Sequence, residues 1–148
     1  MVHFPQGDFD FMQTGPEQAV GNANAKLQPA LDAEMVAFHN FGDEILPGIT
    51  AIGTPGHTPG HTAWMIESGG NSLIHIVDAA PSAYTSPAHP EWAFNFDGDP
   101  EQAAESRSMI FEMAASEDTP IFGYHFTYPG TGYIRATEMA YEFTPFAF

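Results

Sequence analysis

Two histidines on one short loop are the first residues whose types and spacing could do chemistry. Residues 54–62 read TPGHTPGHT, so the unit Pro-Gly-His occurs twice and places an imidazole at His57 and at His61. Glycine before each histidine allows a tight turn, and proline removes alternative backbone conformations. A loop this stiff can hold an imidazole nitrogen within the few tenths of an ångström that a metal ion requires.

The elements after this loop indicate where further ligands lie. Residues 62–67 and 73–77 read as two strands, and the Ser-Gly-Gly-Asn sequence between them is typical of a hairpin turn. Asp78 follows the second strand directly. Another short strand is predicted over residues 120–124, and His125 follows it.

His61, Asp78 and His125 therefore all lie where a predicted strand meets a loop. If these strands share one sheet, their ends can converge at one edge of it. Two imidazoles and a carboxylate are ordinary ligands for zinc, or for manganese or iron, in a chain that has no cysteine. We predict a metal site built from these three side chains.

The N-terminal part of the chain reads as a short strand, ended by Pro5, and then one helix over residues 15–38. The helix is predicted from apolar residues spaced by three or four, although Pro29 must kink or split it. These apolar residues are Leu27, Leu31, Met35 and Phe38. A turn and a strand are predicted over residues 43–53.

The C-terminal part contains the clearest helix start in the sequence. After a long loop over residues 79–98, Asp99 is a predicted N-cap, proline occupies the first helical position, and Gln102 completes a capping box. The helix runs to about residue 116, with Arg107 on or near its apolar face. Short β segments are predicted near residues 133–135 and 139–143.

Composition limits the possible partners. The 148 residues fit one domain, 1–148, and 43% of them are hydrophobic. The formal net charge of -16 argues against binding to nucleic acid or to an anionic membrane surface, because both would be repelled. No apolar run is long enough for a membrane span, and the N-terminus lacks the features of a signal peptide. The compartment stays open, since there is no cysteine to indicate one.

Several motifs together resemble a known family. TPGHTPGHTAW is followed by a hairpin, an aspartate at a strand end, FDGDPEQAAESR and YHFTYPGTGYI. In this order the motifs resemble the C-terminal half of a metallo-β-lactamase-fold hydrolase, closest to the branch of methyl parathion hydrolase and related lactonases. The resemblance covers nearly the whole chain. It implies an α+β fold, half of an αββα sandwich, with a mixed β-sheet and helices on one face.

The resemblance implies a role for each potential ligand. His61 matches the histidine that completes the first-metal site, Asp78 the carboxylate that bridges two metals, and His125 the histidine of the second-metal site. The HxHxDH motif of the family lies in its N-terminal half and has no match here. The zinc site is dinuclear in the complete family, so we expect metal binding by this chain alone to be weak or absent.

Other residues near these motifs have less direct roles. His57 is expected to support a ligand rather than to bind metal. His89, on the long loop, could touch substrate, and Trp92 and Phe126 could form a hydrophobic wall. Phe94 and Phe96 are expected in the core. Each of the three potential ligands also has an interpretation without metal. His61 could be a turn histidine, Asp78 a turn-forming aspartate, and His125 a histidine of an aromatic cluster.

The resemblance implies hydroxide-mediated hydrolysis of small-molecule esters, lactones or organophosphates. No catalytic residue is assigned within this chain, and we expect it to be inactive without the HxHxDH half. The alternative is a non-catalytic, self-associating remnant or metal-binding module. In either case one sheet face lacks its partner layer, so we expect a homodimer or association with the missing N-terminal half.

Overall fold

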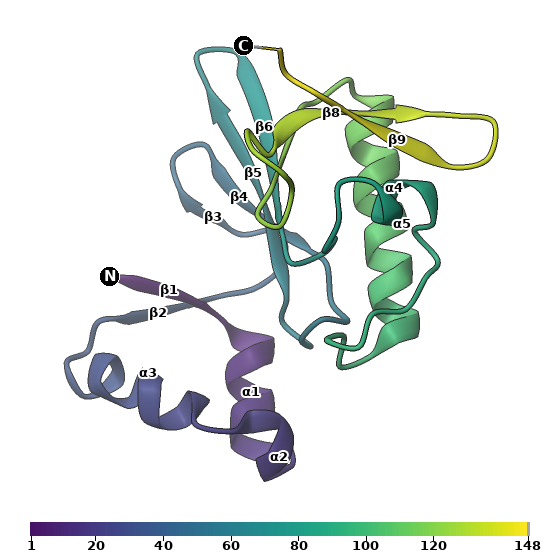
Figure 1. The fold of residues 1–148 in the computed structure, drawn as a ribbon. Helices are drawn as coiled ribbons and strands as arrows, with labels where there is room; N and C mark the ends of the chain where they lie inside the picture. The colour runs from purple at the N-terminus through teal and green to yellow at the C-terminus, as the bar shows by residue number, and fades with distance from the viewer. Residues whose placement is uncertain (148) are drawn as a thin grey trace.

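A mixed sheet forms the centre of the computed structural model, which describes residues 1–147 without the side chains of residues 18 and 19 (Figure 1). The sheet order follows the chain, β3-β4-β5-β6-β7-β8-β9. Within this sheet, β6 and β7 run parallel and the other described pairs run antiparallel. The strands are β3 Glu44–Leu46, β4 Ile49–Gly53, β5 Thr62–Ser68, β6 Asn71–Val77, β7 Ile121–Gly123, β8 Thr131–Ala136 and β9 Tyr141–Pro145.

The predicted hairpin is confirmed as β5 and β6. Its two-residue loop is Gly69-Gly70, with φ angles of 58° and 80°. Two successive residues with positive φ are what a tight hairpin turn of the right twist requires, and glycine adopts this conformation without strain. The turn therefore fixes the strand register, which places Trp64 opposite His75.

The predicted C-terminal helix is confirmed as α5, Pro100–Ser116. The Asp99 side chain accepts a hydrogen bond from the backbone N–H of Gln102 at 3.1 Å. The capping box is not completed, because the Gln102 side chain donates to Glu105 instead. The Asp99 backbone N–H donates to the Gly56 carbonyl, which ties the helix start to the Pro-Gly-His loop.

α5 covers one face of the sheet and forms the core with it (Figure 1). Alternate residues of the strands point toward the helix, as a period of two requires. The fully buried members are Ala63, Ile74, Ile76, Ile121 and Ile134 from the sheet, and Ile110, Phe111 and Ala114 from α5. The expected α+β class, with a mixed sheet and its long helix on one face, is confirmed.

The N-terminal residues form a smaller α/β unit beside the sheet (Figure 1). Strand β1, Val2–Pro5, pairs in parallel with β2, Val36–His39. Between them lie α1 Gln6–Thr14, α2 Glu17–Val20 and α3 Ala23–Asp32.

The single helix predicted over residues 15–38 is therefore wrong. Gly21 has a φ of 56° and separates α2 from α3, and Glu34 has a φ of 53° just after α3. Met35 and Phe38 are exposed rather than packed in a helical stripe. Pairing with β1, remote in sequence, determines the conformation of residues 36–39 and overrides the local apolar spacing.

Two helices lie where none was predicted. One is α1, and the other is the short α4, Thr85–Ala88, within the predicted loop 79–98. None of the helices described in residues 1–147 has the length and apolar character needed to cross a membrane.

The sheet face opposite α5 has no helix layer over it. Many of its side chains are apolar and partly exposed, and they alternate with the core residues along each strand. They include Ile49, Trp64, Ile66, Leu73, Phe122 and Tyr133. The N-terminal unit reaches this face where His39 lies against Trp64, with ring centroids 5.1 Å apart, and where the Phe41 ring packs on Gly53.

Candidate metal centre

The parallel pair β6 and β7 brings two potential ligands together. Val77 pairs with Gly123, so Asp78 and His125 leave neighbouring strands at the same edge of the sheet. His125 Nε2 lies 2.8 Å from Asp78 Oδ1, although the residues are 47 positions apart. Loops at the carboxyl ends of adjacent parallel strands are common binding sites for this topological reason.

His61 reaches the same place from the loop before β5. Its Nε2 accepts a hydrogen bond from the Asp78 backbone N–H at 3.1 Å, so this nitrogen is unprotonated. Nδ1 then carries the proton and donates to the Thr54 carbonyl at 3.0 Å, with the Thr54 hydroxyl 2.8 Å away. A backbone carbonyl on one ring nitrogen is the usual support for a histidine that binds metal through the other.

Burial favours the neutral form of the same histidine. Only 6% of His61 is exposed, and burial is the main reason that its pKa is lowered, with nearby His57 lowering it further. The neutral imidazole is the form that binds metal. The ring is thus in a suitable tautomer and charge state.

The donor types fit zinc, but the present contacts are not those of a metal site. Within residues 1–147 no three such side chains are grouped closely enough to hold a metal ion. The Asp78 backbone N–H donates a hydrogen bond to His61, whereas the Asp78 carboxylate is hydrogen-bonded to His125. A metal ion would have to replace the hydrogen bond between His125 and Asp78 and displace its proton.

His57, the histidine of the first Pro-Gly-His unit, contacts a network of buried charged residues. Its Nδ1 lies 3.3 Å from Asp97 Oδ1, and its ring meets that of His61 at 5.6 Å between centroids. Asp97 Oδ2 in turn accepts from Arg107 at 3.1 Å. The sequence contained one sign of this network, a charged residue on the apolar face of a predicted helix.

Asp8 of α1 is a further residue that the sequence analysis missed. Its carboxylate accepts from the Gly60 backbone N–H at 2.6 Å and from the Thr58 hydroxyl at 3.0 Å. These bonds join the N-terminal unit to the loop that carries His61. No local pattern predicts them, because Asp8 lies about fifty positions from that loop.

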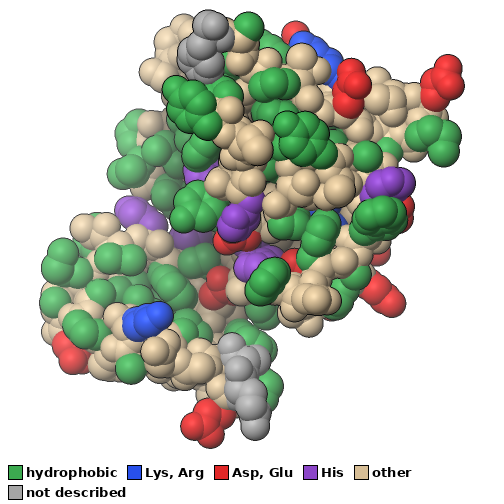
Figure 2. Space-filling view, in the orientation of Figure 1, with side chains coloured by type: hydrophobic (Ala, Val, Ile, Leu, Met, Phe, Trp, Pro, Cys, Tyr) green, Lys and Arg blue, Asp and Glu red, His purple; other side chains and the backbone are tan. Residues whose placement is uncertain are grey.

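A cleft of about 400 Å³ opens beside Asp78 and His125. Its other walls are His57, Pro81, Phe94, Phe96 and Asp97. Phe94 and Phe96 thus line the cleft rather than the core, and Phe96 is 83% exposed. In Figure 2 several histidines gather where the two parts of the molecule meet.

A second, larger cleft of about 980 Å³ shares His57, Phe96 and Asp97 with the first. It extends between Phe11 of α1 and the start of α5. The two clefts therefore form a continuous surface around His57.

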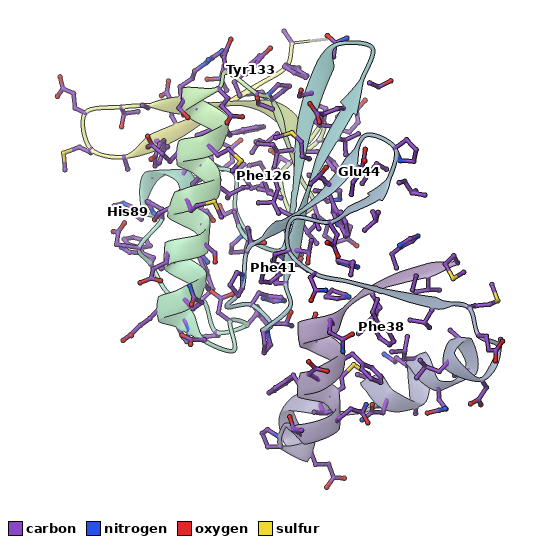
Figure 3. The ribbon with its side chains drawn as sticks, turned by 180° about the vertical axis from the view of Figure 1, so that it is seen from behind. Phe38, Phe41, Glu44, His89, Phe126 and Tyr133 are labelled. Carbon is purple, nitrogen blue, oxygen red and sulfur yellow. The ribbon has the colours of Figure 1, made fainter. Side chains whose placement is uncertain are left out.

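The residues predicted to touch substrate lie elsewhere. His89 stacks on Trp92 with ring centroids 4.0 Å apart, and neither lines the two clefts. Phe126 is 7% exposed and packs on Phe143 in the core. His89 and Phe126 lie on opposite sides of α5 (Figure 3).

Comparison with models of known families gives no match, and none is found among curated proteins. Solved structures do match. The chain is similar to AbOPH, a hydrolase of the beta-lactamase superfamily, with a TM-score of 0.89 and 26% identity over 100% of this chain and 55% of that one. It is also similar to AidC, a dizinc quorum-quenching lactonase solved with the product N-hexanoyl-L-homoserine, with a TM-score of 0.84 and 24% identity over 99% and 55% of the two chains.

A more distant match is the AiiA mutant from B. thuringiensis, solved with N-decanoyl-L-homoserine at its active site. Its TM-score is 0.62, with 22% identity over 84% of this chain and 46% of that one. The chain thus spans about half the length of the solved structures it matches. This chain has the fold of about half of a hydrolase of the metallo-β-lactamase superfamily.

Proposed function

We propose that the chain is the part of a metal-dependent hydrolase that holds His61, Asp78 and His125. The observation that carries this proposal is the contact of Asp78 with both histidines at one sheet edge. The substrates proposed are lactones, carboxylic esters or organophosphate triesters. Similarity to AidC, a dizinc lactonase, supports zinc as the metal.

Each residue has a distinct task in this proposal. His61 offers Nε2, which the Nδ1–H bond to Thr54 keeps unprotonated. Asp78 and His125 offer a carboxylate and an imidazole from adjacent strand ends. Bound zinc supplies a Lewis acid and lowers the pKa of a coordinated water. Three protein ligands are too few for two metals, so we expect the isolated chain to bind one metal weakly and not to hydrolyse substrate.

The cleft also indicates which part of a substrate lies against this chain. Phe94 and Phe96 form an apolar wall, which suits an uncharged acyl or aryl group. The carboxylates of Asp78 and Asp97 lie in the same cleft, and the chain has a net charge of -16. An anionic group would be repelled, so we propose neutral substrates.

Metal titration of the full chain tests the site. We expect zinc affinity to fall at least about tenfold in His61→Ala and in His125→Ala, as loss of a metal-supporting group does elsewhere. His89→Ala is the matched control, because this histidine lies outside both clefts. Zinc affinity that is unaffected by removal of His61 and His125 would overturn the proposal.

Hydrolysis assays separate the enzyme from its alternative. The isolated chain should hydrolyse lactones and aryl esters no faster than His61→Ala. Activity that appears when a polypeptide with the HxHxDH motif is added would assign the chain to a divided hydrolase. Zinc binding with no activity under that condition would assign it to a non-catalytic metal-binding module.

We also propose that the chain by itself forms a homodimer through the sheet face opposite α5. The partly exposed Trp64, Ile66 and Phe122 on this face support the proposal, because monomers rarely expose a large apolar patch. Placing two such faces together about a twofold axis would cover both. The net charge opposes association, although salt screens charges on the outer surfaces.

Light scattering at micromolar concentration measures the association. Ile66→Glu should give a monomer, whereas Tyr84→Glu, at a 71% exposed position on another part of the surface, should not. A wild-type species of 16.1 kDa would refute the dimer.

A further inference from the structure

The most deeply buried charge in the described chain is Arg107 of α5, with 0% of the residue exposed. The side-chain hydrogen bonds described for it go to residues 79–97, the segment that forms one wall of the cleft beside Asp78 and His125. Nε donates to the Ala79 carbonyl at 2.8 Å, and Nη1 donates to the carbonyls of Pro90 and Trp92 at 2.8 and 3.0 Å. The guanidinium also lies 4.6 Å from the centre of the Phe94 ring. A buried guanidinium is tolerated because its donors are satisfied.

The charge of Arg107 is balanced by Asp97, whose side chain is 4% exposed. The two carboxylate oxygens face different partners. Oδ2 accepts from Arg107 Nη2 at 3.1 Å, and Oδ1 faces His57 Nδ1 at 3.3 Å. An ionised carboxylate only accepts hydrogen bonds, so the proton of this contact must be on His57 Nδ1.

Whenever the ring is neutral, His57 Nε2 is then its unprotonated nitrogen. None of the described residues makes a hydrogen bond to it. The His57 side chain is 28% exposed, and it lines both clefts. The Nδ1 side of the ring faces a buried carboxylate, so we infer that Nε2 lies on the side that faces the clefts.

We propose that Arg107 and Asp97 are positioning residues that fix His57 as a hydrogen-bond acceptor in the cleft. His57 Nε2 would accept from an N–H or O–H group of a neutral ligand bound beside Asp78 and His125. This inference rests on the proposed function, because it assigns a ligand contact within the same site. A carboxylate that holds the Nδ1–H of a histidine while Nε2 faces a ligand is a known way to fix a tautomer.

Asp97→Asn is the sharpest test, because an amide has one accepting oxygen and one donating nitrogen. Arg107 can only donate, so the amide oxygen must face it. The amide N–H₂ group then faces His57 and requires an unprotonated Nδ1. The proton of the neutral ring should therefore move to Nε2, which reverses the donor and acceptor sides of His57.

The tautomer can be read directly from ¹⁵N NMR of the imidazoles in the full, metal-free chain at a pH where they are neutral. We expect Nδ1–H at His57 in the wild type and Nε2–H in Asp97→Asn. Glu91→Gln is the matched control, because Glu91 lies 3.4 Å from His89 Nδ1 on the surface. It should leave the His57 signals unchanged. A wild-type His57 with the proton on Nε2, or with both tautomers populated, would overturn the proposal even if the variant fails to fold.

The proposed hydrogen bond from a ligand to His57 Nε2 can be tested with N-hexanoyl-L-homoserine lactone. This molecule has an amide N–H and no net charge. Its addition should shift the His57 Nε2 signal in the wild type. Asp97→Asn should weaken its binding about 2- to 10-fold, as the loss of one hydrogen bond does. No shift at His57 on saturation with the probe would overturn the acceptor role. Zinc binding at His61, read from its own ring signals, tests the proposed function separately.

Discussion

Replacing Asp8 by alanine removes the link between α1 and the loop that carries His61. Two hydrogen bonds are lost, one from the Gly60 backbone N–H at 2.6 Å and one from the Thr58 hydroxyl at 3.0 Å. Hydrogen bonds to a charged group contribute about 1.5–3 kcal/mol each when water is excluded. Asp8 is only partly buried, so water can replace part of both. We expect the free energy of unfolding to fall by roughly 2–3 kcal/mol.

Asp8→Asn should cause only part of this loss in the free energy of unfolding. The amide keeps one accepting oxygen but loses the charge and the second acceptor, so about half of the loss, roughly 1–1.5 kcal/mol, is expected. Asp10→Ala is the matched control on the same helix. Asp10 is exposed, and its carboxylate accepts a hydrogen bond from Gln6 of the same helix. Its removal should change the free energy of unfolding by about 0.5 kcal/mol or less.

Urea unfolding followed by tryptophan fluorescence measures these differences, with the slope against urea unchanged for all variants. Trp64 is the informative reporter, because it lies in β5 immediately after the loop. If Asp8→Ala and Asp10→Ala have the same midpoint within error, the hydrogen bonds of Asp8 do not hold the loop, and the reasoning fails.

Three further variants test the core, the buried histidine and the loop. Ile74→Ala, at a position with 0% exposure, should lower the free energy of unfolding by about 2–5 kcal/mol in urea, whereas Val2→Ala at an exposed position should have little effect. Burial lowers the pKa of His39 in the folded protein, whereas the same histidine in the unfolded chain keeps its ordinary pKa of about 6.5. Below that pH the unfolded chain binds the proton more readily, so the free energy of unfolding should fall as pH falls. His39→Phe should make this fall shallower between pH 7.5 and 5.5, and His89→Gln should not. Gly56→Ala should destabilise by roughly 3 kcal/mol or more, since its Cβ would lie 2.2 Å from the Ala103 nitrogen, and Gly42→Ala, where φ is also positive but space is open, should cost less.

The elements that were predicted correctly have strong local signals. Gly69-Gly70 determines the β5–β6 turn, and the Asp99 cap determines the start of α5, so each needs only a few neighbouring residues. Strand ends can also be recognised from a few neighbouring residues, which is why Asp78 and His125 could be placed at strand ends from the sequence. Their adjacency needed one further assumption, that the two strands share a sheet.

The parts that were missed depend on contacts between distant residues. Val36–His39 form a strand because β1 lies beside them, and their apolar spacing alone indicated a helix. Asp8 and Asp97 reach the Pro-Gly-His loop from 40 to 52 positions away, so their roles could not be found in any local window. Phe94 was placed in the core by its apolarity, although the bonds of Arg107 to the neighbouring carbonyls hold its segment along the cleft.

The parallel pairing of β6 with β7 has a consequence for the order of folding. β4, β5 and β6 are joined by short connections and can pair early, which brings His61 next to the Asp78 backbone. β7 can join only after residues 78–120, including α5, have crossed over the sheet, because parallel strands need a long connection. Closing that long loop is slow relative to forming a hairpin. We therefore expect His125 to arrive last of the three, so that a metal ion captured during folding would meet two of the proposed ligands before it meets the third.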